Sequence, residues 1–69
     1  MIAKVDTEKI QVFMLRKRHT NRFMADFLGL SEVGWRLKRD GKTQFTAVEL
    51  KAIADLYGIK VDDLYVKAS

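Results

Sequence analysis

Few side chains in this chain could carry out catalysis, and their spacing does not bring them together. His19 is the only histidine, no cysteine is present, and the residues before His19 are cations rather than a nucleophile or an orienting carboxylate. A metal site needs several such ligands at once, so His19 is expected at the surface, at a helix end. Asp62 and Asp63 could form a carboxylate pair, but acids also favour the first turn of a helix. We therefore expect no enzyme activity, no metal and no cofactor.

Basic side chains offer a different chemistry, the binding of a polyanion. The chain has 13 Lys and Arg against 9 Asp and Glu, a net charge of +4, and the excess lies within residues 1–42. Most of it falls in two clusters: Arg16–His19 with Arg22, and Arg36, Lys38, Arg39 and Lys42. Such clustering favours nucleic acid as the ligand. A solvated surface that keeps a small protein in solution gives the same pattern, and charge alone does not separate the two interpretations.

Helices must position these side chains, because the chain has no proline and only four glycines. The first helix begins at a capping Asp6 or Thr7 and ends near Arg16–Arg18. Cations stabilise the negative end of a helix dipole, so this run is either a dipole partner or a phosphate contact. The apolar face of the helix has residues at helical spacing, widened by two more: Ile10, Phe13 and Met14, then Val12 and Leu15.

Two short helices are expected in the middle of the chain, joined by a tight turn. The first of them, Asn21–Leu28, has Thr20 as its N-cap and ends at Gly29, because glycine adopts the left-handed conformation that terminates helices. The next helix begins after a capping Ser31 and runs to about Arg39.

Helices joined by so short a turn cross steeply, with their backbones close together. This packing needs a small residue on the first helix, and Ala25 provides it. Trp35 is expected to anchor the pair in the core. Phe23 falls on the outer side of its helix, where either the preceding helix or a second subunit could cover it. The outer face of the second helix is then free to enter a major groove.

A capping box at Thr46 and Glu49 begins a fourth helix, which ends at Gly58. A last short helix is expected at Val61–Tyr65. The sequence thus predicts a single all-α domain of five helices over residues 1–69. No apolar run approaches the length of a membrane span and no signal peptide opens the chain. We therefore expect a cytoplasmic protein without a membrane partner.

In the order and spacing of its motifs, the chain resembles the lambda-type Cro/repressor helix-turn-helix family of phages and bacteria. The resemblance covers roughly residues 9–66, and its stretches are Leu15-Arg16, TNRFMADFLGL at 20–30, GKTQFT at 41–46 with Glu49, and residues 53–59 and 61–64. It implies a compact, five-helix, lambda-repressor-like domain whose helix-turn-helix spans about residues 21–40. It also implies a Cro-like phage or prophage transcriptional regulator that binds double-stranded operator DNA, with a homodimer on a two-fold site as one arrangement.

The resemblance assigns DNA contacts residue by residue. Base contacts fall on the outer face of the recognition helix, at Glu32, Val33, Arg36 and Leu37. Phosphate contacts fall on Asn21, Arg22, Ser31, Lys42 and Thr43. Arg36 could read a guanine edge with two hydrogen bonds, Glu32 could accept from cytosine N4, and Val33 could contact a thymine methyl group.

Three features depart from the family pattern. The family's arginine at the position of Arg16 usually pairs with a glutamate, but this chain has Arg39 there, so the two repel unless Asp40 substitutes. Lys38 occupies a position that is usually apolar, although its alkyl stem can still pack. Gly34 lies inside the recognition helix, where glycine costs about 1 kcal/mol relative to alanine.

The outer face of the recognition helix also supports a different function. Val33 and Leu37 place apolar side chains where a DNA reader is often polar. An apolar patch with adjacent charges is typical of a helix face that binds protein. The alternative is therefore a regulator that keeps the fold but binds a partner repressor protein, as an antirepressor or co-repressor.

Overall fold

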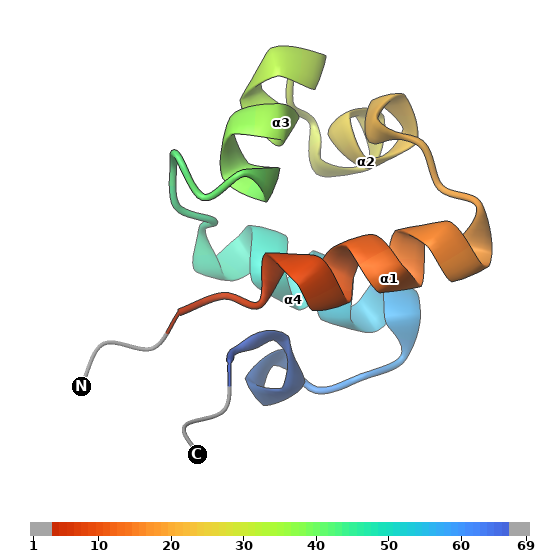
Figure 1. Cartoon of the computed structure of the whole chain (residues 1–69), viewed down its shortest axis with the longest axis vertical. Coiled ribbons are helices and arrows are strands. Elements are labelled where there is room, and N and C mark those ends of the chain that lie inside the picture. The colour runs from red at the N-terminus through yellow and green to blue at the C-terminus, as the bar shows by residue number, and fades with distance from the viewer. Residues whose placement is uncertain (1–3, 67–69) are drawn as a thin grey trace.

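Four α-helices and one 3-10 helix make up residues 4–66, the part of the chain that the computed structural model describes. They are α1 (Thr7–Lys17), α2 (Asn21–Leu28), α3 (Glu32–Arg39), α4 (Ala47–Tyr57) and η1 (Val61–Leu64). In Figure 1, α2 and α3 lie together at one end, α1 crosses the middle with α4 behind it, and η1 lies at the other end. The all-α class is as expected from the sequence.

The last element differs from the fifth α-helix predicted at Val61–Tyr65. It is a single 3-10 turn that ends at Leu64, and the Tyr65 N–H donates to the carbonyl of Asp62. Tyr65 is extended and forms an antiparallel bridge with Val5. This pairing holds Tyr65 in an extended conformation, so the helical turn does not continue past Leu64.

The helix N-termini are capped by the side chains that the sequence indicated. Thr20 accepts from the Phe23 N–H and Ser31 from the Gly34 N–H, each at 3.0 Å. Thr46 and Glu49 form the expected capping box, with reciprocal bonds of 2.8 and 3.1 Å. These bonds satisfy backbone donors that have no partner within their own helix. Local chemistry therefore determines where α2, α3 and α4 begin.

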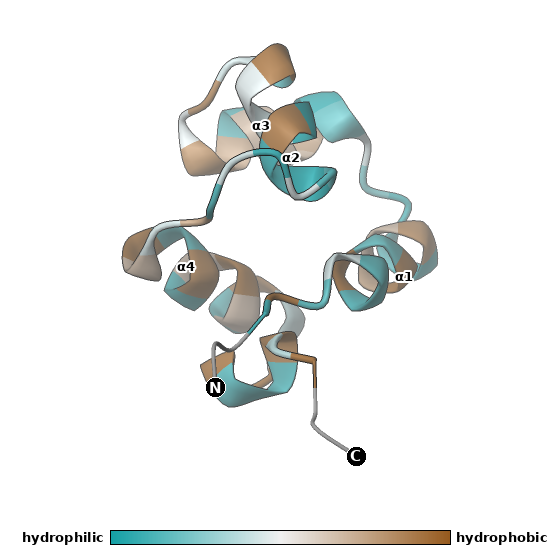
Figure 2. Cartoon of the chain, turned by 60° about the vertical axis from the view of Figure 1, so that its left-hand side comes forward, coloured by the Kyte–Doolittle hydropathy of each residue, from teal (hydrophilic) through white to brown (hydrophobic). Residues whose placement is uncertain are grey.

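The helices surround a small core to which every element contributes. Figure 2 shows α1 and α4 on opposite sides, with α2 and α3 above and η1 below. Trp35 is fully buried, as expected. The buried apolar residues are Ile10, Met14, Met24, Ala25, Trp35, Leu50, Ile53, Ala54 and Leu64.

Two apolar residues of α1 do not join this core, contrary to the prediction. Val12 is 46% exposed and Leu15 is 80% exposed. Successive helical residues are about 100° apart, so Leu15 points well away from the line through Ile10 and Met14. Ile10 and Met14 are the buried residues of α1. Val12 and Leu15, which were expected to widen the apolar face, remain on the surface.

A partly buried ion pair joins α3 to α4. The Lys38 ammonium lies 2.5 Å from Glu49 Oε1 and also donates to the Gln44 carbonyl at 3.2 Å. Burial alone raises the pKa of the Glu49 carboxyl, but hydrogen bonds from Lys38 and Thr46 outweigh burial and lower the pKa below its usual value. Lys38 occupies a position where the family usually has an apolar residue. Its charge is accommodated there because Glu49 pairs with it.

Candidate nucleic-acid interface

The outer face of α3 carries all four side chains expected to contact bases. The Ser31 cap sets the first turn of α3, and the buried Trp35 fixes which side faces the core. The opposite side is therefore turned to solvent. Glu32, Val33, Arg36 and Leu37 are all exposed on it. This face mixes one acid, one base and two apolar groups.

Glu32 and Arg36 interact with each other on this face. The Arg36 Nη2 lies 3.6 Å from Glu32 Oε1, one helical turn away, and both side chains are about half exposed. Exposed pairs of this kind contribute only about 0.2–1 kcal/mol. Arg36 can therefore exchange the carboxylate for another acceptor, such as the edge of a guanine, at little cost.

A hydrogen-bond network places the Asn21 side chain between α2 and α3. Its Oδ1 accepts from the buried Trp35 Nε1 at 2.9 Å and from the Arg39 Nη1 at 3.1 Å. Both bonds use the amide oxygen, so the amide NH2 is left to donate to something outside α3. The backbone N–H groups of Asn21 and Arg22 stand in the first turn of α2, where helices provide no acceptor. This end of α2 therefore gathers donors suited to an anion.

Arg39 is held in the same network. Its Nε lies 3.1 Å from Asp40 Oδ1, so Asp40 pairs with Arg39 itself. Among residues 4–66 no ion pair joins Asp40 to Arg16, the substitution that the sequence left open. Reasoning from sequence did not foresee the bond from Arg39 to Asn21. The available signal was a buried tryptophan whose indole N–H must find an acceptor.

The remaining predicted phosphate contacts are exposed, but the backbone donors of two of them, Lys42 and Thr43, are occupied. Arg22, Ser31, Lys42 and Thr43 all lie on the surface. The N–H groups of Lys42 and Thr43 both donate to the Leu37 carbonyl, at 2.8 and 3.3 Å, in the turn that ends α3. Any contact from this loop to a phosphate must therefore come from the two side chains.

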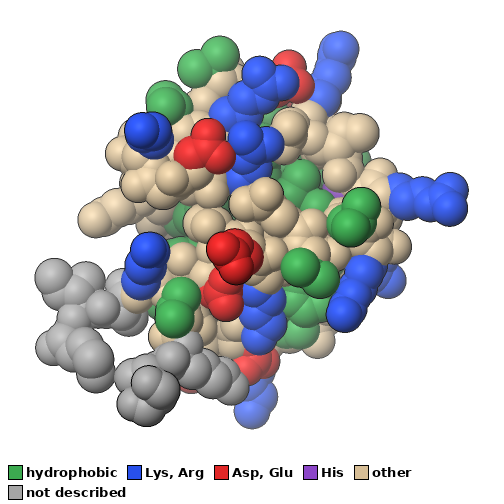
Figure 3. Space-filling model, viewed as in Figure 1, with side chains coloured by type: hydrophobic (Ala, Val, Ile, Leu, Met, Phe, Trp, Pro, Cys, Tyr) green, Lys and Arg blue, Asp and Glu red, His purple; other side chains and the backbone are tan. Residues whose placement is uncertain are grey.

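The positive charge around α3 is smaller than the sequence suggested. Within the second basic cluster, Lys38 pairs with Glu49 and Arg39 with Asp40, and both are half-buried. Lys42 and Arg36 remain exposed. Figure 3 shows Lys and Arg side chains projecting from several parts of one face, with Asp and Glu among them. The surface is therefore mixed rather than uniformly basic.

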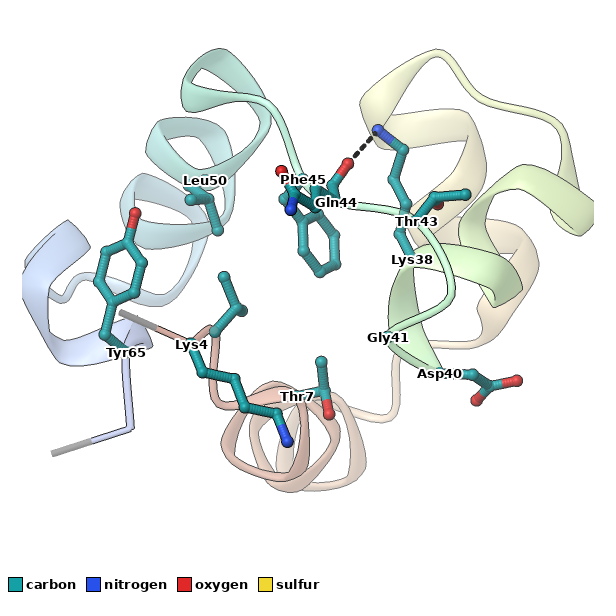
Figure 4. Close-up of a pocket in the computed structure, with 11 residues that line it drawn as sticks. Lys4, Thr7, Lys38, Asp40, Gly41, Thr43, Gln44, Phe45, Leu50 and Tyr65 are labelled. Atoms are coloured by element: carbon teal, nitrogen blue, oxygen red, sulfur yellow. Dashed lines mark hydrogen bonds between the residues drawn. The ribbon is translucent and has the colours of Figure 1, made fainter. Parts of the chain in front are cut away.

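A cleft of about 690 Å³ lies between the segment before α1 and the loop that joins α3 to α4. In Figure 4, Phe45 and Leu50 point into it from one side and Thr7 faces them, whereas Asp40 points away. Two cations line the cleft, Lys4 and Lys38, and Lys38 is already paired with Glu49. The polar groups of the cleft therefore do not converge on one point, as they would around a specific small ligand.

His19 is half-buried, rather than at the surface as the sequence predicted. Its ring stacks on Phe23, with centroids 4.2 Å apart, and its Nδ1 is hydrogen-bonded to the Tyr57 hydroxyl at 3.0 Å. Burial raises the pKa of Tyr57 to about 12. The contact with Tyr57 joins residues that are distant in the chain, so the sequence around His19 does not predict it.

Over residues 4–66, no three His, Asp or Glu side chains gather closely enough to hold a metal ion. Within the same range, no helix has both the length and the apolar character needed to cross a membrane. Comparison of the chain with protein-family models, curated proteins and solved structures finds no match.

Proposed function

We propose that the chain is a Cro-like phage-type transcriptional regulator in which α2 and α3 form a helix-turn-helix that binds operator DNA. One observation carries the proposal: the exposed face of α3 lies beside an α2 N-terminus whose Asn21 amide is oriented by bonds from α3. A base-reading surface and a phosphate-binding end are thereby held in one rigid unit. Helix-turn-helix proteins use this division between phosphate and base contacts.

In this arrangement α3 enters the major groove, whose width of about 12 Å matches a helix with its side chains. Arg36 leaves Glu32 to donate two hydrogen bonds to a guanine. Glu32 then accepts from a cytosine N4, and Val33 contacts a thymine methyl group. Leu37 packs against the edge of the groove, beyond Arg36.

The phosphate contacts fix α3 in the groove without reading sequence. Asn21 donates through its NH2 group and through the first-turn amides of α2, which the helix dipole favours for an anion. Arg22, Lys42 and Thr43 contribute from either side, together with the Ser31 hydroxyl. With Lys38 and Arg39 already paired, few cations of the second basic cluster remain, so this part of the surface should add little to non-specific binding at physiological salt.

Replacement of Arg36 tests the groove contact, with Lys51 as a matched control. Both residues are exposed cations in pairs spaced four residues apart, Glu32–Arg36 on α3 and Lys51–Asp55 on α4. Each alanine variant removes one positive charge and one weak pair. Arg36→Ala should weaken binding to the preferred duplex by about 1–3 kcal/mol and relax the preference for one base pair. Lys51→Ala should change affinity only slightly; equal losses in the two variants would refute base reading by Arg36.

A second candidate function is favoured by the apolar part of the same face. Val33 is 66% exposed and Leu37 is 40% exposed, which suits capture of a partner repressor protein. Val33→Asp and Leu37→Asp should then abolish capture of that protein in a pull-down. The helical circular-dichroism signal should stay unchanged, because both positions face solvent. Retention of partner binding by both variants would exclude this surface.

A further inference from the structure

A column of stacked aromatic rings reaches the surface along α2. Phe13 of α1 stacks on Tyr57 of α4 with centroids 5.0 Å apart, and His19 lies 5.6 Å from Tyr57. His19 then stacks on Phe23 at 4.2 Å, and Phe23 lies nearly parallel to Phe27 at 6.1 Å. Each ring limits the motion of the next, so the outer two rings are held in fixed positions.

The outer end of this column is open to solvent. Phe23 is 40% exposed and Phe27 is 43% exposed, one turn apart on α2. Isolated exposed apolar groups are common on proteins. Two parallel rings that are already ordered are a better binding surface, because little further side-chain entropy is lost on association.

Two opposite charges border the rings on the same helix. Arg22 and Asp26 are also one turn apart, and their stripe lies about 100° around α2 from the stripe of Phe23 and Phe27. Both are exposed, and neither forms an ion pair with any other residue in the described range 4–66. The surface therefore presents two rings with one unpaired cation and one unpaired anion beside them.

We propose that these four residues, the α2 aromatic face, bind the same face of a second copy of this chain around a two-fold axis. A two-fold interface must be complementary to itself. Pairing two α2 helices antiparallel reverses the order of residues along one of them. Phe23 then lies opposite Phe27 of the second copy, and Arg22 lies opposite Asp26 of the second copy. The two-fold axis repeats each of these pairs with the two copies exchanged. The order of charges and rings along α2 is therefore complementary to itself. Binding to a protein of different sequence would not need this self-complementarity, so it favours a second copy as the partner.

The size of the face sets the strength of this association. An eight-residue helix is only about 12 Å long, whereas a standard stable interface buries about 800 Å² on each partner. The α2 aromatic face alone is smaller, so the dimer should be weak and in rapid exchange. We expect a dissociation constant of roughly tens to hundreds of micromolar. The contact does not depend on DNA.

Sedimentation equilibrium of the full chain without DNA tests the proposal. The weight-average mass should rise with protein concentration toward that of two chains, at both physiological and high salt, because ring contacts are not screened by salt. Phe27→Gln removes two rings from each dimer and should raise the dissociation constant about tenfold or more. Val48→Gln is the control, because Val48 is 79% exposed on α4 and lies outside the face. It should leave the dissociation constant unchanged.

Charge exchange gives the sharper test. Arg22→Asp makes both charges of the face acidic, and Asp26→Arg makes both basic, so at physiological salt each variant should associate with itself more weakly than the unmodified chain. A mixture of the two variants should associate, because each then meets its opposite. Circular dichroism should show that both variants keep the helical signal of the unmodified chain.

Any of three results would overturn the proposal: a mass that stays that of one chain at every concentration, equal weakening by Phe27→Gln and Val48→Gln, or failure of the mixed charge variants to associate. Because no DNA is present, these results are separate from the proposed function.

Arg22 takes part in both proposals, as a partner of Asp26 in the dimer and as a phosphate contact. DNA binding that survives in Phe27→Gln but fails in Arg22→Asp would show that the phosphate contact does not depend on the dimer.

Discussion

Asn21 joins the stability of the fold to the proposed phosphate contact, and its replacement separates the two roles. Asn21→Ala removes the acceptor of the Trp35 indole N–H, which is fully buried. A buried donor without a partner costs about 1–3 kcal/mol. Arg39 loses less, because it keeps Asp40 and its side chain is 25% exposed. We expect the free energy of unfolding to fall by about 2 kcal/mol, a large share for a domain of this size.

Urea denaturation followed by circular dichroism measures this loss. The same substitution in a Trp35→Phe background, where no indole N–H is present, should cost about 1–2 kcal/mol less. The difference isolates the Trp35–Asn21 bond from the effect of the cavity that Trp35→Phe creates. If Asn21→Ala costs the same in both backgrounds, the bond does not stabilise the fold and the reasoning is wrong.

Asn21→Asp then tests the phosphate contact without loss of stability. A carboxylate still accepts from Trp35 and Arg39, and an acid in the first turn of α2 is favoured by the helix dipole by about 0.3–1 kcal/mol. The variant, however, lacks the NH2 donors and repels a phosphate. Stability should be kept or raised, and DNA affinity should fall about tenfold or more, a loss of about 1.4 kcal/mol. Unchanged DNA affinity would remove Asn21 from the interface.

Two further predictions concern the fold itself. The pKa of Glu49 is lowered in the folded chain, so the unfolded chain binds the proton more tightly. The stability that the Lys38–Glu49 pair contributes is therefore present at neutral pH. It is lost as the pH falls below 4.5 and through the pKa of the folded state. Glu49→Gln should therefore flatten the acid limb of a plot of unfolding free energy against pH, and an unaltered limb would contradict the role of the pair. Arg18 ends α1 with φ of 57°, in the left-handed region, so Arg18→Gly should raise the free energy of unfolding by about 0.5–1 kcal/mol. A lower urea midpoint for that variant would mean that the Arg18 side chain stabilises the fold.

The start of each central helix could be predicted because it depends on residues close together in the chain. Thr20 bonds the amide three residues later, Ser31 does the same, and the Thr46–Glu49 box closes within one turn. The sequence also predicts that four side chains of α3, those proposed for base contacts, face outward, and all four are exposed. A buried Trp35 and the helical period are enough to place them.

The contacts between helices could not be predicted in the same way, because they depend on crossing angles that no local pattern encodes. Lys38 meets Glu49, and Asn21 meets both Trp35 and Arg39, only once the helices are packed. Sequence counting therefore overestimated the free positive charge near α3. In α1, helical spacing alone did not show that Leu15 lies outside the core.

Titration of the protein into labelled duplexes tiled across its own genomic neighbourhood tests the central claim most directly. The proposed regulator should bind one tile tightly at low salt and retain that preference at physiological salt, because base contacts from α3 add to the salt-sensitive phosphate contacts. Uniform weak binding that disappears as salt is raised, or no binding to any tile, would contradict sequence-specific DNA recognition and favour the protein-partner function of the Val33 and Leu37 surface.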